Sequence, residues 1–150
     1  MNNLKAELLR GLWYVACPGS EIKPGKMIGK KLMGELVLLA RDNSGKVFAL
    51  RDICPHRGIP LRHGWFDGEH VQCCYHGWKF EVTGKAVDLP NVPPGVRHHE
   101  TVRIKAYPTR EYGEIVWAWM GPAEAMPEVP QMEFGLVPPE RRYVCKQLIE

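Results

Sequence analysis

The sequence lacks the features that mark membrane, secreted and nucleic-acid-binding proteins. Its apolar runs, such as residues 36–40, are far shorter than the ~20 residues of a membrane-spanning helix. Its charge is nearly balanced, with 20 Lys and Arg against 17 Asp and Glu and no basic run, so we expect no nucleic-acid partner. Residues 1–10 have no apolar core of the kind found in signal peptides. We therefore expect a cytoplasmic protein without a membrane span.

Long helical periodicity is also scarce. Apart from one or two helical turns expected at residues 4–9, apolar residues occur in short alternating runs, which favour strands. The 15 Gly and 13 Pro indicate many turns, and hairpin loops are predicted at residues 42–45, 83–84 and 111–113. The predicted strands are residues 13–17, 26–33, 36–41, 46–51, 70–73, 79–82, 85–89, 102–107 and 115–120. This pattern predicts an all-β sandwich or barrel.

A disulfide framework is not indicated, because the chain has five Cys, an odd number, and no secretory signal. Two of these Cys stand close to a His. Cys54 and His56 lie in C-P-H-R-G at residues 54–58, and Cys73 and His76 lie in C-C-Y-H-G-W at residues 73–78. One or two residues separate Cys from His, so each pair can approach a metal centre from a single tight loop. A Pro in the first loop and a Gly behind each His suit such turns.

Two thiolates and two imidazoles are the ligand set of a Rieske [2Fe–2S] centre, in which two His replace two Cys on one iron. We predict that Cys54 and Cys73 hold one iron of the cluster and that His56 and His76 hold the other. A structural zinc site also uses two Cys and two His, but zinc fingers place the Cys pair first and the His pair second. The order found here disfavours zinc, which remains the alternative occupant.

The segment C-P-H-R-G…C-C-Y-H-G-W-K-F resembles the cluster-binding motif of Rieske non-haem iron oxygenases, the aromatic-ring-hydroxylating and O-demethylating enzymes. The phthalate dioxygenase and vanillate demethylase branch is the most similar, and residues 13–16, 47–50 and 83–85 also match that family's pattern. The resemblance covers about residues 10–120. It implies a Rieske fold, in which antiparallel sheets carry a small cluster-binding subdomain.

Respiratory Rieske proteins differ from this chain around the cluster. They carry an extra Cys in each loop, where this chain has Ile59 and Tyr75, and they place Ser and Tyr hydroxyls at the positions of Trp78 and Phe80. Fewer hydrogen bonds to the cluster sulfurs leave the reduced, more negative state less stabilised. We therefore expect a reduction potential near the low end of the Rieske range, about −150 mV.

Cys74 leaves one ambiguity of register, because it directly follows Cys73. The family motif has two residues between Cys and His, and Cys73 satisfies that spacing to His76. Trp78 is expected to cover the cluster or simply to pack in the core. The remaining Cys and His are expected to be structural or solvated: Cys17, His63, His70, His98, His99 and Cys145.

The resemblance also predicts a domain order. Residues 1–120 are expected to form the Rieske domain, and residues 121–140, which are rich in Pro, a linker or arm. An alternating pattern at residues 142–149 suggests a strand, so residues 141–150 are expected to begin a truncated catalytic domain. In the family that domain holds a mononuclear Fe(II) in a 2-His-1-carboxylate triad. The last His of this chain is His99, so the triad is expected only in the missing domain.

The implied function is one-electron transfer within an oxygenase that hydroxylates or demethylates an aromatic substrate with O₂. A reductase or ferredoxin would supply the electron, which the family passes to the mononuclear iron of a neighbouring subunit in a homotrimer. This chain alone should carry electrons without activating O₂. A free-standing Rieske-type ferredoxin is the alternative, and a structural module holding zinc is a third possibility.

Overall fold

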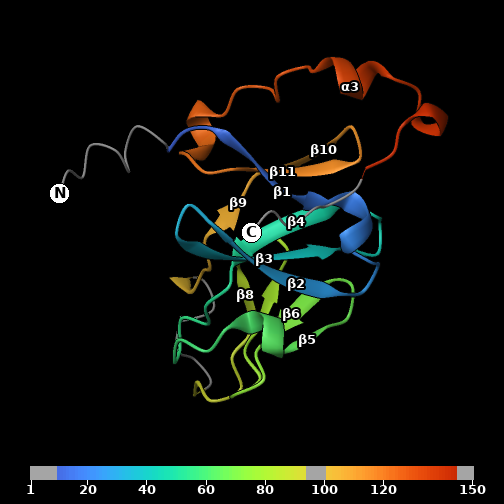
Figure 1. Ribbon diagram of the computed structural model, residues 1–150. Helices are drawn as coiled ribbons and strands as arrows, with labels where there is room; N and C mark the ends of the chain where they lie inside the picture. The colour runs from blue at the N-terminus through green and yellow to red at the C-terminus, as the bar shows by residue number, and fades with distance from the viewer. Residues whose placement is uncertain (1–9, 94–100, 145–150) are drawn as a thin grey trace. The chain divides into compact units, whose positions relative to one another are not determined.

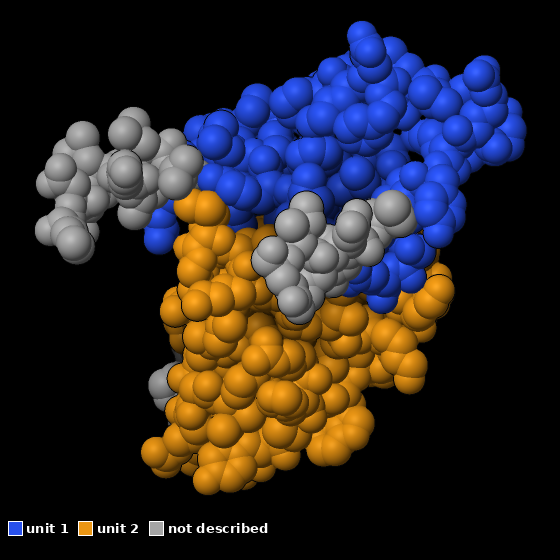
Figure 2. Space-filling model, in the orientation of Figure 1, with its two compact units in different colours: residues 1–21, 108–150 blue, residues 22–107 orange. Residues whose placement is uncertain are grey.

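The computed structural model describes residues 10–93 and 101–144 (Figure 1). The chain divides into two compact units, which Figure 2 colours separately. Unit 1 comprises Met1–Glu21 and Pro108–Glu150, and unit 2 comprises Ile22–Tyr107. The helical turns expected at residues 4–9 lie outside the described residues. Strands account for most of the regular structure and all pair antiparallel, which confirms the predicted all-β class.

Unit 2 contains two four-stranded antiparallel sheets. The first has the order β2-β3-β4-β9 and the second has the order β5-β6-β7-β8. The strands of the first sheet are β2 (Met27–Leu32), β3 (Glu35–Arg41), β4 (Val47–Arg51) and β9 (Ala106–Tyr107). Those of the second are β5 (Trp65–Phe66), β6 (His70–Gln72), β7 (Lys79–Glu81) and β8 (Ala86–Asp88).

One hydrophobic core joins the two sheets. Leu38 of β3 and Leu50 of β4 pack in one cluster with Val71 of β6 and Phe80 of β7, and all four side chains are fully buried. Burying an apolar side chain of this size stabilises a fold by about 1.5–3 kcal/mol. Cys54 and Cys73 belong to the same cluster of buried residues. The two predicted thiolate ligands therefore sit in the hydrophobic core of unit 2.

The predicted hairpin loop at residues 42–45 joins β3 to β4. Asp42 Oδ1 accepts hydrogen bonds from the Ser44 N–H at 2.9 Å, the Ser44 hydroxyl at 2.6 Å and the Lys46 N–H at 2.9 Å. Gly45 has a φ of 85°, which favours glycine. This turn fixes the pairing of β3 with β4, from Val37 opposite Arg51 to Arg41 opposite Val47, and so fixes where the chain leaves β4.

The strand predicted at residues 102–107 is much shorter, because this segment changes partners. The N–H of Ile104 donates to Gly84 O in the β7–β8 hairpin, whereas the Arg51 N–H donates to Lys105 O. Only β9 pairs regularly, with β4. The segment thus bridges the two sheets of unit 2 instead of extending one of them.

Unit 1 has a three-stranded sheet of order β1-β11-β10, made of β1 (Trp13–Pro18), β11 (Ile115–Trp119) and β10 (Thr109–Tyr112). The sequence pattern misses β10, and the turn predicted at residues 111–113 lies at Gly113 and Glu114. Both have positive φ, 62° and 65°, as a two-residue hairpin loop of type I′ requires.

Residues 121–141, in the segment predicted as a linker or arm, belong to unit 1 and are hydrogen-bonded to its sheet. They contain the short helix α3 (Glu133–Leu136) and two 3₁₀ turns. Trp13 Nε1 donates to Pro127 O at 2.9 Å and the Tyr112 hydroxyl donates to Met132 O at 3.0 Å. Residues 142–144 form no strand, contrary to the prediction for 142–149, whose remainder is not described. No helix in the described ranges is long and apolar enough to cross a membrane.

We expect Asp42→Ala to lower the free energy of unfolding by about 1 kcal/mol at neutral pH, because the turn loses its side-chain acceptor. The Ser44 hydroxyl, followed by the two backbone donors, keeps the pKa of Asp42 below its ordinary value of 3.8, and these hydrogen bonds outweigh the opposing effect of burial. A depressed folded-state pKa gives stability that is present above pH 3.8 and lost as the pH falls below it. Denaturant unfolding at a series of pH values checks both points. A pH-independent difference would contradict the electrostatic part.

Candidate metal centre

Two loops of unit 2 share one backbone plan. In the first, the Cys54 N–H donates to Ile59 O at 2.8 Å and the Gly58 N–H donates to Cys54 O at 2.9 Å. In the second, the Cys73 N–H donates to Trp78 O at 2.8 Å and the Gly77 N–H donates to Cys73 O at 3.1 Å. Each Cys therefore opens a turn that a residue four places later closes.

The closing residue is a glycine in both loops for a steric reason. Gly58 has a φ of 73° and Gly77 a φ of 74°, and side chains disfavour this left-handed conformation. The sequence predicts a bend at both glycines, and the structure confirms it. Within the common turn, His56 stands two residues after its Cys and His76 stands three residues after its Cys. The two imidazoles therefore leave equivalent turns from different positions.

The two loops bring the four predicted ligands together in two pairs. Cys54 and Cys73 are only 2% and 3% exposed, and their thiols are hydrogen-bond neighbours. The ring centroids of His56 and His76 are 4.6 Å apart with an interplanar angle of 57°. Among the described residues, no three His, Cys, Asp or Glu side chains form a group that could hold a single metal ion.

The electrostatics of the pairs suit a metal cluster. Burial, with a further contribution from Cys73, raises the pKa of Cys54 to about 11, so the thiol is neutral in the absence of a metal. A coordinated metal deprotonates such a thiol. Burial and the neighbouring charges of His76 and Arg57 lower the pKa of His56, which keeps its imidazole neutral as a ligand must be.

One buried atom points to a missing partner. His56 Nδ1 is buried and has no hydrogen-bond partner in the described part of the chain. Buried polar atoms are rarely left unpaired, so an orphaned ring nitrogen in a loop that also carries a buried thiol is what a metal ligand looks like without its metal. The residues present therefore fit a cluster held by two thiolates and two imidazoles.

Aromatic rings flank the imidazoles. The indole of Trp78 stacks on His56, with ring centroids 4.5 Å apart and an interplanar angle of 3°. The ring of Tyr75 contacts that of His76 at 4.0 Å, and Tyr75 is itself exposed. The sequence allowed Trp78 to cover the cluster or to pack in the core. The structure places it against a predicted ligand.

The other Cys and His residues lie elsewhere. Cys74 is exposed, although it is the chain neighbour of buried Cys73. Cys17 is buried in β1 of unit 1, as expected of a structural residue. His63 is exposed, and His70 Nδ1 lies 3.6 Å from Asp67 Oδ2. His98, His99 and Cys145 lie outside the described residues.

The sequence analysis missed two residues that hold the loops in place. Asp52 is fully buried two residues before Cys54. Gly64 lies so close to the backbone before Cys73 that an added Cβ would be 1.9 Å from Gln72 O. Gly64 lies outside every predicted strand, so its identity is only a weak sequence signal of such close approach. An isolated Asp at the end of an apolar strand gives no comparable signal.

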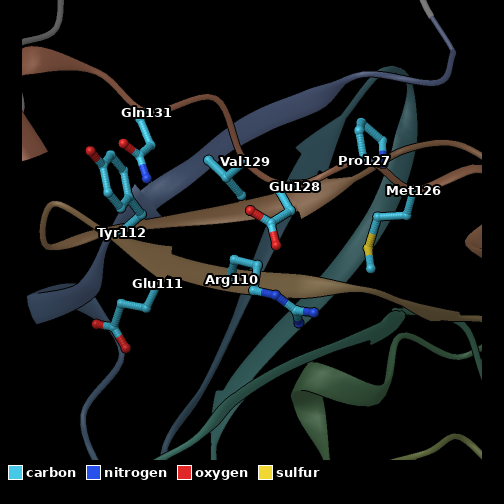
Figure 3. Close-up of a pocket in the computed structure, with 8 residues that line it drawn as sticks. All are labelled: Arg110, Glu111, Tyr112, Met126, Pro127, Glu128, Val129 and Gln131. Atoms are coloured by element: carbon cyan, nitrogen blue, oxygen red, sulfur yellow. The ribbon is translucent and has the colours of Figure 1, made fainter.

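A separate pocket of about 290 Å³ lies in unit 1 (Figure 3). Strand β10 contributes Arg110 and Tyr112 to its lining, and the segment at residues 126–131 contributes Glu128. No Cys or His lines this pocket. It is therefore distinct from the candidate metal centre.

Comparisons with known proteins agree with this geometry. A family model described as "Rieske [2Fe-2S] domain" matches residues 12–108. The oxygenase subunit of 3-chlorobenzoate-3,4-dioxygenase from Comamonas testosteroni is 36% identical over 142 residues, which cover 93% of this chain and 33% of that protein. The chain thus spans about a third of the length of this curated relative.

Two solved structures extend the comparison. Apo dicamba monooxygenase matches with a TM-score of 0.78 and 33% identity over 87% of this chain and 40% of that one. An oxygenase–ferredoxin complex of carbazole 1,9a-dioxygenase matches with a TM-score of 0.69 and 27% identity over 81% of this chain and 31% of that one.

We expect Cys73→Ser to remove bound iron and visible absorbance, because a hydroxyl cannot replace the buried thiolate beside Cys54. Cys74→Ser is the matched control and should keep both, since Cys74 is exposed. Iron analysis and visible spectra of the two purified variants check this. Retained colour in Cys73→Ser would mean that the register of the second loop is wrong.

Proposed function

The chain belongs to the Rieske [2Fe–2S] domain family, and from this premise we propose that it is the electron-transferring domain of an oxygenase subunit. The observation that carries the proposal is that two matching turns place two buried thiols as hydrogen-bond neighbours and two imidazoles with ring centroids 4.6 Å apart, one of which has an orphaned Nδ1. The alternative occupant, zinc, would provide no electron transfer.

We assign Cys54 and Cys73 to one iron and His56 and His76 to the other. When bound, the cluster supplies reversible one-electron chemistry at a low potential. The chain's own residues do the rest. The core keeps water from the thiols, the two turns orient the imidazoles, and Trp78 covers one face of His56. Both His are partly exposed while both Cys are buried, so the imidazole side is the side through which electrons would be exchanged.

The oxygenase activity is proposed for a longer protein. The matched oxygenase subunit is about three times as long as this chain's match to it. We propose that residues beyond 150 hold a mononuclear Fe(II) in a 2-His-1-carboxylate triad and act on an aromatic substrate with O₂. The predicted boundaries of the Rieske domain at 1–120, the arm at 121–140 and the following domain at 141–150 stay predictions.

A reductase or a ferredoxin is the proposed electron donor, which agrees with the matched oxygenase–ferredoxin complex. A homotrimer of the longer protein is the proposed assembly. Cys54, Cys73 and Cys74 form no disulfide in the described part of the chain. Free thiols are typical of reducing compartments, which supports the proposed cytoplasmic location.

Electron paramagnetic resonance of the reduced protein, together with iron and sulfide analysis, tests the function. We expect two irons and two sulfides per chain and a rhombic signal from one added electron, as in a Rieske centre. A folded, colourless protein that binds zinc in place of iron would overturn the proposal. The coding sequence after residue 150 separates an oxygenase subunit from a free ferredoxin. Two His and one acidic residue that can form the iron triad are expected there for an oxygenase subunit and not for a ferredoxin.

We further expect a reduction potential of about −150 mV, because no hydroxyl lies at the positions of Trp78 and Phe80 to stabilise the reduced cluster. Phe80 is fully buried in the core, and Trp78 is stacked on His56. Neither position therefore leaves room for a water molecule that could donate a hydrogen bond in place of the absent hydroxyl. Redox titration followed by circular dichroism in the visible range measures the potential. A value well above zero would refute this explanation.

A further inference from the structure

Asp52 is the one charged side chain that is buried among the described residues. It follows β4 directly and lies two residues before Cys54. Taking a carboxylate out of water costs several kcal/mol unless a partner compensates it. A buried charge next to a metal ligand therefore needs a structural or functional reason.

Both carboxylate oxygens of Asp52 face Arg62. Oδ1 accepts the Arg62 backbone N–H at 2.8 Å, and Oδ2 lies 2.8 Å from Arg62 Nη1. Oδ2 has no aligned hydrogen-bond donor in the described part of the chain, so this ionic contact is what compensates it. Arg62 belongs to the 3₁₀ turn Leu61–His63, so the contact joins the two ends of the segment at residues 52–62. Cys54 and His56 both lie inside the segment that it closes.

Arg62 is also held from a second side. A Cβ built on Gly29 of β2 would lie 2.4 Å from both Cδ and Nη1 of Arg62. The arginine therefore lies across β2 in the space that the missing side chain leaves. Its side chain is 32% exposed, while that of Asp52 is fully buried. The positive end of the pair thus meets solvent, and the negative end is buried two residues before Cys54 in the chain.

We propose that the Asp52–Arg62 ion pair is a positioning device of the cluster site, which closes the first ligand loop and biases the reduction potential through its oriented charges. The inference rests on the proposed function, since it needs a cluster at Cys54 and His56. Reduction adds one negative charge. Removing the Asp52 charge makes that addition easier, and removing the Arg62 charge makes it harder.

The test compares Asp52→Asn, Arg62→Gln and the double variant in reconstituted protein. The potential should rise in Asp52→Asn, fall in Arg62→Gln and return toward the wild-type value in the double variant. Each single variant should lose its cluster to a chelator about tenfold faster, the usual size of an effect from a residue supporting a metal ligand. Asparagine preserves the acceptor for the Arg62 N–H, so Asp52→Asn keeps the test valid if Arg62→Gln does not fold.

Two further variants separate this role from a merely structural one. Gly29→Ala displaces the Arg62 side chain without changing either charge, and should speed cluster loss. Lys105→Gln removes the more exposed ion pair with Glu35, which spans 3.2 Å, and should leave the potential and cluster retention unchanged. The proposal would be overturned if Asp52→Asn and Arg62→Gln both kept the wild-type potential, or if both shifted it in the same direction. Absence of any cluster in the wild-type protein would instead refute the proposed function.

Discussion

The site depends on two short backbone turns with the same hydrogen bonds. In each turn the carbonyl of a buried Cys accepts a hydrogen bond from the N–H of the glycine four residues later. The N–H of the same Cys donates to the carbonyl of the residue that follows this glycine. These bonds leave the Cβ of the Cys directed by backbone alone, without help from any long side chain. Because Gly58 and Gly77 have positive φ, the identity of the closing residue follows from the turn. A rigid presentation of ligands requires little else from the local sequence, which explains how so short a motif carries the site.

The same turns produce an asymmetry between the two ligand types. The thiols belong to the hydrophobic core, whereas the imidazoles are partly exposed and flanked by rings of Trp78 and Tyr75. Neutral thiols are tolerated in an apolar core as small hydrophobic groups, and burial favours that neutral form. A metal cluster reverses the situation, because the thiolates it requires are neutralised by the cations they bind. The core thus accommodates the site in either state, and under the proposed function the partly exposed imidazoles are the side through which electrons would be exchanged.

Much of this arrangement could be predicted from local sequence. The four Cys and His residues, the turns at their glycines and the strands with alternating apolar residues all leave short-range signals. Strand β10 left none, since its central residues Arg110 and Glu111 are exposed at the edge of a sheet and carry no apolar alternation. The hydrogen bonds that attach residues 121–141 through Trp13 and Tyr112 could not be predicted either, because the bonded residues are 114 and 20 positions apart in the sequence. Tertiary partners of this kind have no signature in a single sequence.

The Asp52–Arg62 pair shows why such contacts are kept despite their cost. A hydrophobic pair of similar volume would often stabilise a core as well as or better than a buried ion pair does. A hydrophobic pair, however, could not bind a backbone N–H and a guanidinium at once. Asp52 does so, and it thereby ties both the main chain and the side chain of Arg62 to the start of the ligand loop. The loop's own two hydrogen bonds span only residues 54–59, so the contact adds a tie between Asp52 and the 3₁₀ turn that contains Arg62. Geometric definition next to the ligands, more than stability, is therefore what the buried charge contributes.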